Sequence, residues 1–155
     1  MSITEFVTSV LTDKSNKQKK FLLNLIERVE AENIEVKTNI NLKNYKRTMD
    51  NFGVKHTFKK HRNAQTEASR GQMAIEIADF SHIPSIVSEP DDIIFGAMND
   101  MGNSLIQYIK AIEKFKYFYI EEIRTGRKEI VLQTFYKRAV KKKIRQREST
   151  DFDIS

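Results

Sequence analysis

Two histidines stand close together in a strongly basic stretch of the chain. His56 and His61 fall within residues 54–62, a segment with several lysines and an arginine but no acidic side chain. Imidazole is the side chain best suited to move protons near neutral pH, and nearby cations both attract a phosphate and lower a histidine pKa. This segment therefore suits general acid–base chemistry on a phosphodiester.

The spacing of the two histidines leaves alternatives open. Residues five apart lie about 140° apart around a helix and on opposite faces of a strand, so that the two rings can share a site only in a loop or across a helix end. Taken singly, either histidine is more often a surface or capping residue. His82, which comes just before an expected helix start at Pro84, is interpreted as structural.

A metal site is the rival use of these histidines. It requires two or three converging ligands, usually with a carboxylate among them. The nearest acids along the chain are Asp50 and Glu67. Because a cationic surround repels a divalent ion, the sequence predicts no metal site and no cofactor.

Three further residues could complete a phosphate site. Arg70 is expected on the exposed opening turn of a helix, where it could clamp a phosphate or simply pair with Glu67 three residues earlier. Thr134 and Tyr136 share a face of an expected strand, and their hydroxyls could bond a phosphate or line an ordinary sheet edge.

The charge of the chain points to an anionic partner. The 155 residues carry 27 Lys and Arg against 21 Asp and Glu, which makes the formal net charge +6. Seven of the eleven residues 137–147 are cationic, and their alternative role is that of a solvated helix end. The cations predicted to bind nucleic acid are Lys55, Lys59, Lys60, Arg62, Lys137, Arg138, Lys141 and Lys142.

Several classes of protein are excluded by composition. The chain has no cysteine, and therefore no disulfide, thiolate metal site or cysteine nucleophile. No apolar run approaches the length of a membrane span, and the first twenty residues lack the layout of a signal peptide. We expect a cytoplasmic protein of one ordinary domain.

The first half of the chain has mixed periodicity. Ser2 and Glu5 form a capping box for a short first helix, and apolar residues 21–29 predict a second helix that ends near residue 33. Alternation over residues 34–42 predicts a half-buried strand. Residues 44–63 show no clear period and are expected to form a loop.

The second half of the chain is more regular. A third helix is expected over residues 64–80, a short one from Pro84 to about residue 88, and a turn over 89–92. Strands are expected over 105–112, 115–123 and 129–136, with a hairpin turn at 124–127. Strict alternation in the last strand places Ile130 and Leu132 on the face of Thr134 and Tyr136.

Aromatic residues follow one face of the middle strand. Phe115, Tyr117 and Tyr119 alternate there, with Phe118 on the other face. Exposed aromatic residues on a sheet can stack unpaired bases, but such a stripe is more often core. We expect at least half of these rings to be core.

These elements predict an α+β protein in which N-terminal helices precede a small antiparallel sheet of about four strands and a basic C-terminal helix. The expected organisation is an N-terminal helical region over residues 1–33, an α+β domain over 34–147, and an acidic disordered tail over 148–155.

Residues 54–137 resemble the phage-encoded nuclease families of the superfold shared by barnase, EndoU, tRNA-cleaving colicins and RelE-type toxins. The matching features, in order, are Val-Lys-His56 with Lys-Lys-His61, the helix opening Arg70-Gly71-Gln72, the segment 79–84 followed by Pro90-Asp91, and three strands closing in 133–137. The ordered series is more specific than any one motif.

This resemblance implies cleavage of RNA without a metal ion, by attack of the 2′-hydroxyl on the adjacent phosphate. It makes His56 the best general base or acid and His61 the next, with Arg70 as a phosphate ligand. Thr134 with Tyr136 or Lys137 would complete the site. An inhibitor or a phage protein is a further partner to expect, and the rival interpretation is a non-catalytic RNA-binding or assembly protein of a phage.

Overall fold

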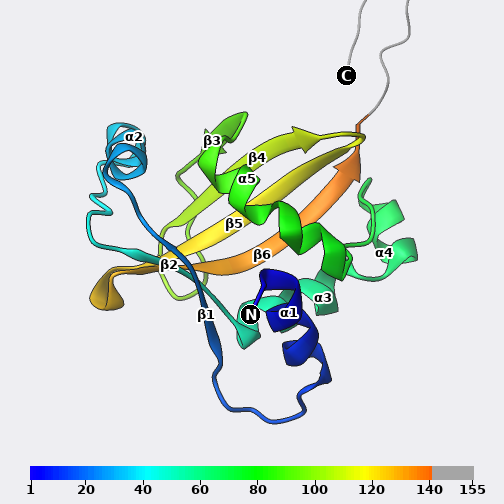
Figure 1. Ribbon diagram of the computed structural model, residues 1–155. Helices are drawn as coiled ribbons and strands as arrows, with labels where there is room; N and C mark the ends of the chain where they lie inside the picture. The colour runs from blue at the N-terminus through cyan, green and yellow to red at the C-terminus, as the bar shows by residue number, and fades with distance from the viewer. Residues whose placement is uncertain (141–155) are drawn as a thin grey trace, which may run out of the picture.

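Six strands form a single mixed sheet in the order β1-β2-β6-β5-β4-β3 (Figure 1). The structure is a computed structural model that describes residues 1–140. Its strands are β1 (Lys20–Leu25), β2 (Lys46–Asp50), β3 (Asp92–Ile94), β4 (Leu105–Ile112), β5 (Phe115–Arg124) and β6 (Glu129–Ala139). Its helices are α1 (Ile3–Thr12), α2 (Arg28–Thr38), α3 (Asn51–His61), α4 (Ala64–Ser69) and α5 (Ile83–Ser88), with 3-10 turns η1 (Ile77–His82) and η2 (Thr125–Arg127).

The α+β class is confirmed, but the sheet is larger and less regular than expected. The prediction of about four antiparallel strands is wrong, because β1, β2 and β3 add to the three strands of the C-terminal half. β2 pairs with β6 in parallel, and the other neighbours pair antiparallel. The predicted strands over 105–112, 115–123 and 129–136 are confirmed as β4, β5 and β6.

The predicted helix over residues 21–33 is wrong in its first half, whereas residues 28–33 are helical as the start of α2. Its first half is β1, which pairs with β2 and is stabilised by backbone hydrogen bonds that no local pattern reveals. The predicted strand over 34–42 is also wrong, because α2 runs to Thr38 and buries Ala31 and Ile34, which lie three residues apart. Asn39 ends this helix in the left-handed conformation, at φ +62°.

Residues 44–63, predicted to be a loop, contain β2 and α3. Asp50 is the last residue of β2 and also the N-cap of α3, and its side chain accepts a hydrogen bond from the Gly53 N–H at 2.8 Å. The capping box of α1 and the short helix α5 are confirmed. The predicted helix over 64–80 is wrong beyond Ser69, because the chain turns at Gly71, at φ +72°.

The predicted basic C-terminal helix is not part of the described structure. Lys137 and Arg138 lie in β6, which continues to Ala139. Residues 141–155, which include Lys141 and Lys142 and the predicted tail, lie outside the described residues.

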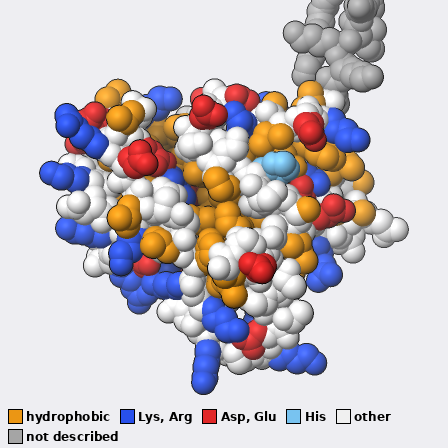
Figure 2. Space-filling view, in the orientation of Figure 1, with side chains coloured by type: hydrophobic (Ala, Val, Ile, Leu, Met, Phe, Trp, Pro, Cys, Tyr) orange, Lys and Arg blue, Asp and Glu red, His pale blue; other side chains and the backbone are white. Residues whose placement is uncertain are grey.

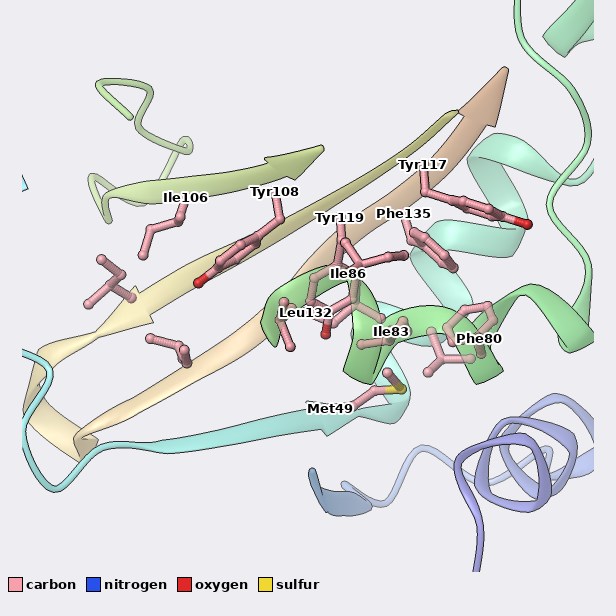
Figure 3. Packing of buried hydrophobic residues seen from close by; sticks show 14 of the residues in the cluster. Met49, Phe80, Ile83, Ile86, Ile106, Tyr108, Tyr117, Tyr119, Leu132 and Phe135 are labelled. Atoms are coloured by element: carbon pink, nitrogen blue, oxygen red, sulfur yellow. The ribbon is translucent and has the colours of Figure 1, made fainter. Parts of the chain in front are cut away.

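One face of the sheet carries the hydrophobic core and its helices. α1, η1 and α5 cover this face, and Ile83 and Ile86 of α5 pack toward Tyr119, Leu132 and Phe135 of the sheet (Figure 3). Tyr117 and Tyr119 are almost fully buried here, as expected for the aromatic stripe.

A buried ion network joins α2 to this side of the sheet. Arg47 of β2 is only 1% exposed and contacts Glu121 Oε2 at 2.7 Å, Glu30 Oε2 at 2.6 Å and the Tyr108 hydroxyl at 3.1 Å. Buried charges of this kind are stable only when they are paired and hydrogen-bonded. The network thus connects α2, β2, β4 and β5.

A large cavity lies beside this network. Its volume is about 1030 Å³, and β1, α2 and α5 contribute to its lining. Figure 2 shows hydrophobic side chains gathered on this face of the molecule. None of the helices within residues 1–140 has the length and apolarity that a bilayer crossing needs.

Candidate active site

The second face of the sheet bears the residues that could take part in a reaction. Ile109, Phe118 and Val131 are buried but do not belong to the core cluster on the helix-covered face. Phe118 and Tyr136 are direct partners in the β5–β6 ladder, and their rings stack with centroids 4.7 Å apart. These two rings mark the part of the second face on which a candidate site can be built.

A β-bulge determines which residues of β6 reach this face. Ile120 pairs with Thr134, but Glu121 pairs with Leu132, so that β6 has one extra residue at this point. Ile130 and Leu132 belong to the core, and the expectation that they share a face with Thr134 and Tyr136 is wrong. Beyond the bulge, Thr134 and Tyr136 do alternate onto one face, opposite Phe135.

α3 carries the two histidines along the edge of β6. It follows β2 without a loop, and β2 is the parallel neighbour of only the first part of β6. α3 then packs against β6, and Gly53 allows a close approach, since an added Cβ would lie 2.4 Å from the Leu132 carbonyl oxygen. His61 is the last residue of α3 and comes beside Tyr136.

His61 is held by a carboxylate that follows it in the chain. Its Nδ1 lies 2.8 Å from Oε1 of Glu67, which is fully buried. Arg70 donates from Nη1 to the other oxygen of Glu67 at 2.9 Å and to the Lys60 carbonyl at 3.0 Å. Arg70 and His61 thus bind the same carboxylate. The ion pair between Arg70 and Glu67 is the alternative role that the sequence predicted for Arg70.

A short helix corner makes this contact possible. α3 ends at His61, Asn63 caps α4 through a hydrogen bond from the Thr66 N–H, and Glu67 lies one turn into α4. The chain therefore folds back so that Glu67 meets His61. Sequence reasoning missed Glu67 as a site residue; the available signal was an acid one turn after an Asn cap that stands two residues after the histidine.

The carboxylate determines what His61 can do. A carboxylate at Nδ1 favours the tautomer with its proton on Nδ1 and leaves Nε2 as a proton acceptor. Within residues 1–140, no hydrogen bond is formed to this Nε2. Burial lowers the pKa of His61, Glu67 raises it through its hydrogen bond and charge, and Lys60 and Arg70 lower it, with a net decrease.

Tyr136 contributes its ring to the site. It stacks on His61 with centroids 5.2 Å apart and an angle of 28°, and its other neighbour is Phe118. A histidine held by a carboxylate and an aromatic ring has little freedom to rotate. Burial raises the pKa of the Tyr136 hydroxyl, against an opposing effect of Arg138, so this hydroxyl stays protonated at neutral pH.

His56 lies on the exposed side of α3, among the cations predicted to bind nucleic acid. Burial lowers its pKa most, and the charges of Lys60, His61 and Lys59 lower it further. The two histidines are therefore near enough to influence each other. Of the predicted basic residues, Lys59, Lys60 and Arg62 are exposed and Lys55 is half-buried.

Two other predicted residues are less accessible. Thr134 is 8% exposed, and within residues 1–140 its hydroxyl has no hydrogen-bond partner. Lys137 lies on the core face, where its Nζ contacts both oxygens of Asp79 at 2.8 and 3.0 Å. Arg138, one residue further, is exposed on the second face.

Comparison with models of protein families shows to which family the chain belongs. A model described as "phage-Barnase-EndoU-ColicinE5/D-RelE like nuclease3" matches residues 24–146. The chain belongs to this nuclease family. Comparison with curated proteins and with solved structures gives no significant match.

The match to this nuclease family includes α3, α4 and strands β2 to β6. The cluster of His61, Glu67, Arg70 and Tyr136 therefore lies within the matched region. The large cavity lies elsewhere, because neither histidine of α3 lines it.

Proposed function

We propose that the protein is a metal-independent endoribonuclease in which His61 and His56 move the protons. The observation that carries this proposal is the orientation of His61, with Nδ1 on Glu67, a ring stacked on Tyr136, and an Nε2 that has no hydrogen-bond partner among residues 1–140. Such a group, with its lowered pKa, suits a general base near neutral pH. His56, five residues earlier on the same helix, is the general acid; because His61 is the last residue of α3, the substrate would bind across the end of this helix.

In this mechanism, Nε2 of His61 takes the proton of a ribose 2′-hydroxyl. The 2′-oxygen forms a bond to the adjacent phosphorus, and the bond from phosphorus to the 5′-oxygen of the next nucleotide breaks. His56 donates a proton to that 5′-oxygen. The products carry a 2′,3′-cyclic phosphate and a 5′-hydroxyl, so atoms and charge balance without an ion or a water molecule.

The charges around α3 support an anionic substrate and metal independence. Lys59, Lys60 and Arg62 lie on the exposed side of α3 or directly after it. No group of three side chains able to hold a metal ion occurs in the described part of the chain, and both oxygens of Glu67 already have partners. The family description, which names a nuclease, supports cleavage of a nucleic acid; the toxin-like role against cellular RNA is part of the proposal.

A second candidate is non-catalytic nucleic-acid binding. The observation that favours it is the burial of His61, which is only 4% exposed while Glu67 and Arg70 are engaged with each other. In that case the cluster would stabilise the corner between α3 and α4, and the exposed cations would bind RNA alone.

The test is cleavage of a structured RNA pool with identification of the cut ends. We expect 2′,3′-cyclic phosphate and 5′-hydroxyl ends, undiminished activity in EDTA, and no cleavage where the scissile ribose is 2′-deoxy. His61→Ala and His56→Ala should each reduce the rate by about 10² to 10⁴. His82→Ala is the matched control, since His82 is half-buried against Tyr117 on the core face.

The outcomes separate the two candidates. Products with 5′-phosphate ends, or loss of activity in EDTA with recovery on magnesium, would contradict the mechanism. RNA binding without cleavage by the wild type would favour the second candidate. Full activity in folded His61→Ala would show that His61 is not the base.

A further inference from the structure

Two cations of like charge face each other directly in the β5–β6 ladder. Lys116 pairs with Arg138, two residues beyond the pair formed by Phe118 and Tyr136. Side chains two residues apart on a strand share a face. Both cations therefore lie on the second face of the sheet, with the candidate active site.

This arrangement is unfavourable for the protein by itself. Like charges directly opposite each other on neighbouring strands destabilise a sheet. Among residues 1–140, no carboxylate forms an ion pair with Lys116 or Arg138, whereas Lys137, the neighbour of Arg138 on β6, is paired with Asp79 on the other face. An uncompensated pair of this kind is expected where an anion supplies the missing charge.

Both cations are positioned by the same aromatic ring. The Arg138 guanidinium carbon lies 5.0 Å from the centroid of Phe118, and the Lys116 Nζ lies 6.0 Å from it. Cation–π contacts at exposed sites are weak. They orient the two side chains while leaving their charge available to a ligand.

A continuous series of contacts links this pair to His61. Arg138 lies over Phe118, Phe118 stacks on Tyr136, and Tyr136 stacks on His61. Arg138 is also near enough to Tyr136 to affect the pKa of its hydroxyl. Along the strands, the Lys116–Arg138 pair lies two residues, about 6.6 Å, beyond the Phe118–Tyr136 pair whose tyrosine stacks on His61.

We propose that Lys116 and Arg138 form a subsite for the phosphodiester that neighbours the scissile phosphate of a single-stranded RNA. Arg138 supplies the planar fork that fits two phosphate oxygens, and Lys116 supplies a point charge opposite. This inference rests on the proposed function, because it assigns the scissile phosphate to the histidines. It gives the two like charges of the pair a role on this face.

The first test measures binding without cleavage. A short oligonucleotide with every 2′-hydroxyl methylated cannot be cut by 2′-attack, and its affinity is measured by fluorescence anisotropy across a range of salt. The double variant Lys116→Gln/Arg138→Gln should bind at least about tenfold more weakly. Its slope of log affinity against log salt should fall by about 0.7, the value for one phosphate contact to a single strand.

Two further variants control for charge and folding. Arg127→Gln/Lys128→Gln removes two exposed cations at the other end of β6 and should leave affinity and slope much closer to wild type. Lys116→Arg/Arg138→Lys keeps both charges and should retain most of the affinity. Equal losses in both Gln variants would show general electrostatic attraction, and an unchanged slope in Lys116→Gln/Arg138→Gln would equally overturn the subsite.

The second test uses cleavage. The substrates are a dinucleotide without a terminal phosphate, the same dinucleotide with a 5′-terminal phosphate, and the same dinucleotide with a 3′-terminal phosphate. For the wild type, one of the two terminal phosphates should lower KM. The Lys116→Gln/Arg138→Gln variant should lose this advantage with little change in kcat. If no RNA is cleaved but the salt slope still falls, the subsite stands and the proposed chemistry fails; if cleavage occurs without these effects, the subsite fails alone.

Discussion

At His61, several charges act on a single imidazole in opposite directions. The negative charge and hydrogen bond of Glu67 raise the pKa of His61, whereas Lys60 and Arg70 lower it in addition to the effect of burial. The protonation state of the proposed base is therefore adjustable through residues that do not touch the substrate. Glu67 and Arg70 are positioning residues in this interpretation.

Glu67→Gln and Arg70→Gln should move the acidic limb of the pH–rate profile in opposite directions. A general base works only when it is unprotonated, so activity rises as the pH passes above its pKa. Loss of the Glu67 charge lowers the pKa of His61 and moves the limb to lower pH, and loss of the Arg70 charge moves it to higher pH. Rates of RNA cleavage over a pH series check both shifts.

The two variants should also differ in maximal rate. Glu67→Gln loses the charged partner that favours one tautomer of His61, and we expect the plateau rate to fall by about 10²-fold, within the range ascribed to a positioned base. Arg70→Gln keeps that partner and should lose less. If the acidic limb moved in the same direction in Glu67→Gln and in Arg70→Gln, this would contradict the role assigned to the cluster.

The sequence indicated the histidines but not their environment. His56 and His61 were recognisable because imidazoles among cations are a local feature of residues 54–62. The contact between His61 and Glu67 depends on how the chain turns between α3 and α4, and the contact between His61 and Tyr136 joins residues far apart in the chain. Non-local contacts of this kind cannot be inferred from spacing alone.

At the scale of elements, the position of α3 against β6 places both histidines. Gly53 is the point of closest approach, where a Cβ would lie 2.4 Å from the carbonyl oxygen of Leu132 and 3.2 Å from its side chain. Backbone atoms cannot move aside as a flexible side chain can. α3 would have to shift away from β6 if this position carried a larger residue.

Gly53→Ala should therefore destabilise the protein and reduce cleavage. Overpacking of this kind costs typically about 1–3 kcal/mol, and displacement of α3 also moves His61 away from Tyr136. Thermal and denaturant unfolding measure the first effect, and the cleavage rate of the folded fraction measures the second. Gly126→Ala is the control, since nothing lies within 4 Å of its Cβ position; equal stability of the two variants would contradict this role of Gly53.

The elements that sequence analysis predicted correctly are those with strong local signals. The β4–β5–β6 meander and the capping box of α1 are of this kind. The missed strands β1 and β2 are short and depend on partners elsewhere in the chain, and the bulge in β6 changes the face of Thr134 and Tyr136 without altering the strand pattern. Alternation therefore predicted that β6 is a strand but not which of its residues reach the site.

At the scale of the whole molecule, the sheet separates stability from the proposed chemistry. The face covered by α1 and α5 holds the core and the Arg47 network, and the other face holds His61, Tyr136 and the Lys116–Arg138 pair. Substitutions on the first face should act mainly on folding, and substitutions on the second mainly on substrate. The Arg47 network allows this separation to be tested with a clear dependence on pH.

Arg47→Met should lower the free energy of unfolding by about 3–5 kcal/mol at neutral pH, because it leaves the fully buried Glu121 without its cation. Burial already raises the pKa of Glu121 and Arg47 opposes this, so the variant raises that pKa further. A carboxyl whose pKa is higher in the folded state contributes stability below its unfolded pKa and loses it as the pH rises through the folded value. The deficit of Arg47→Met against wild type, measured by denaturant unfolding, should thus be smaller in acid than at neutral pH. Arg47→Met/Glu121→Leu, which removes both buried charges, should recover much of the loss; an equal deficit at every pH, with no recovery in the double variant, would show that the ion network does not determine stability on this face.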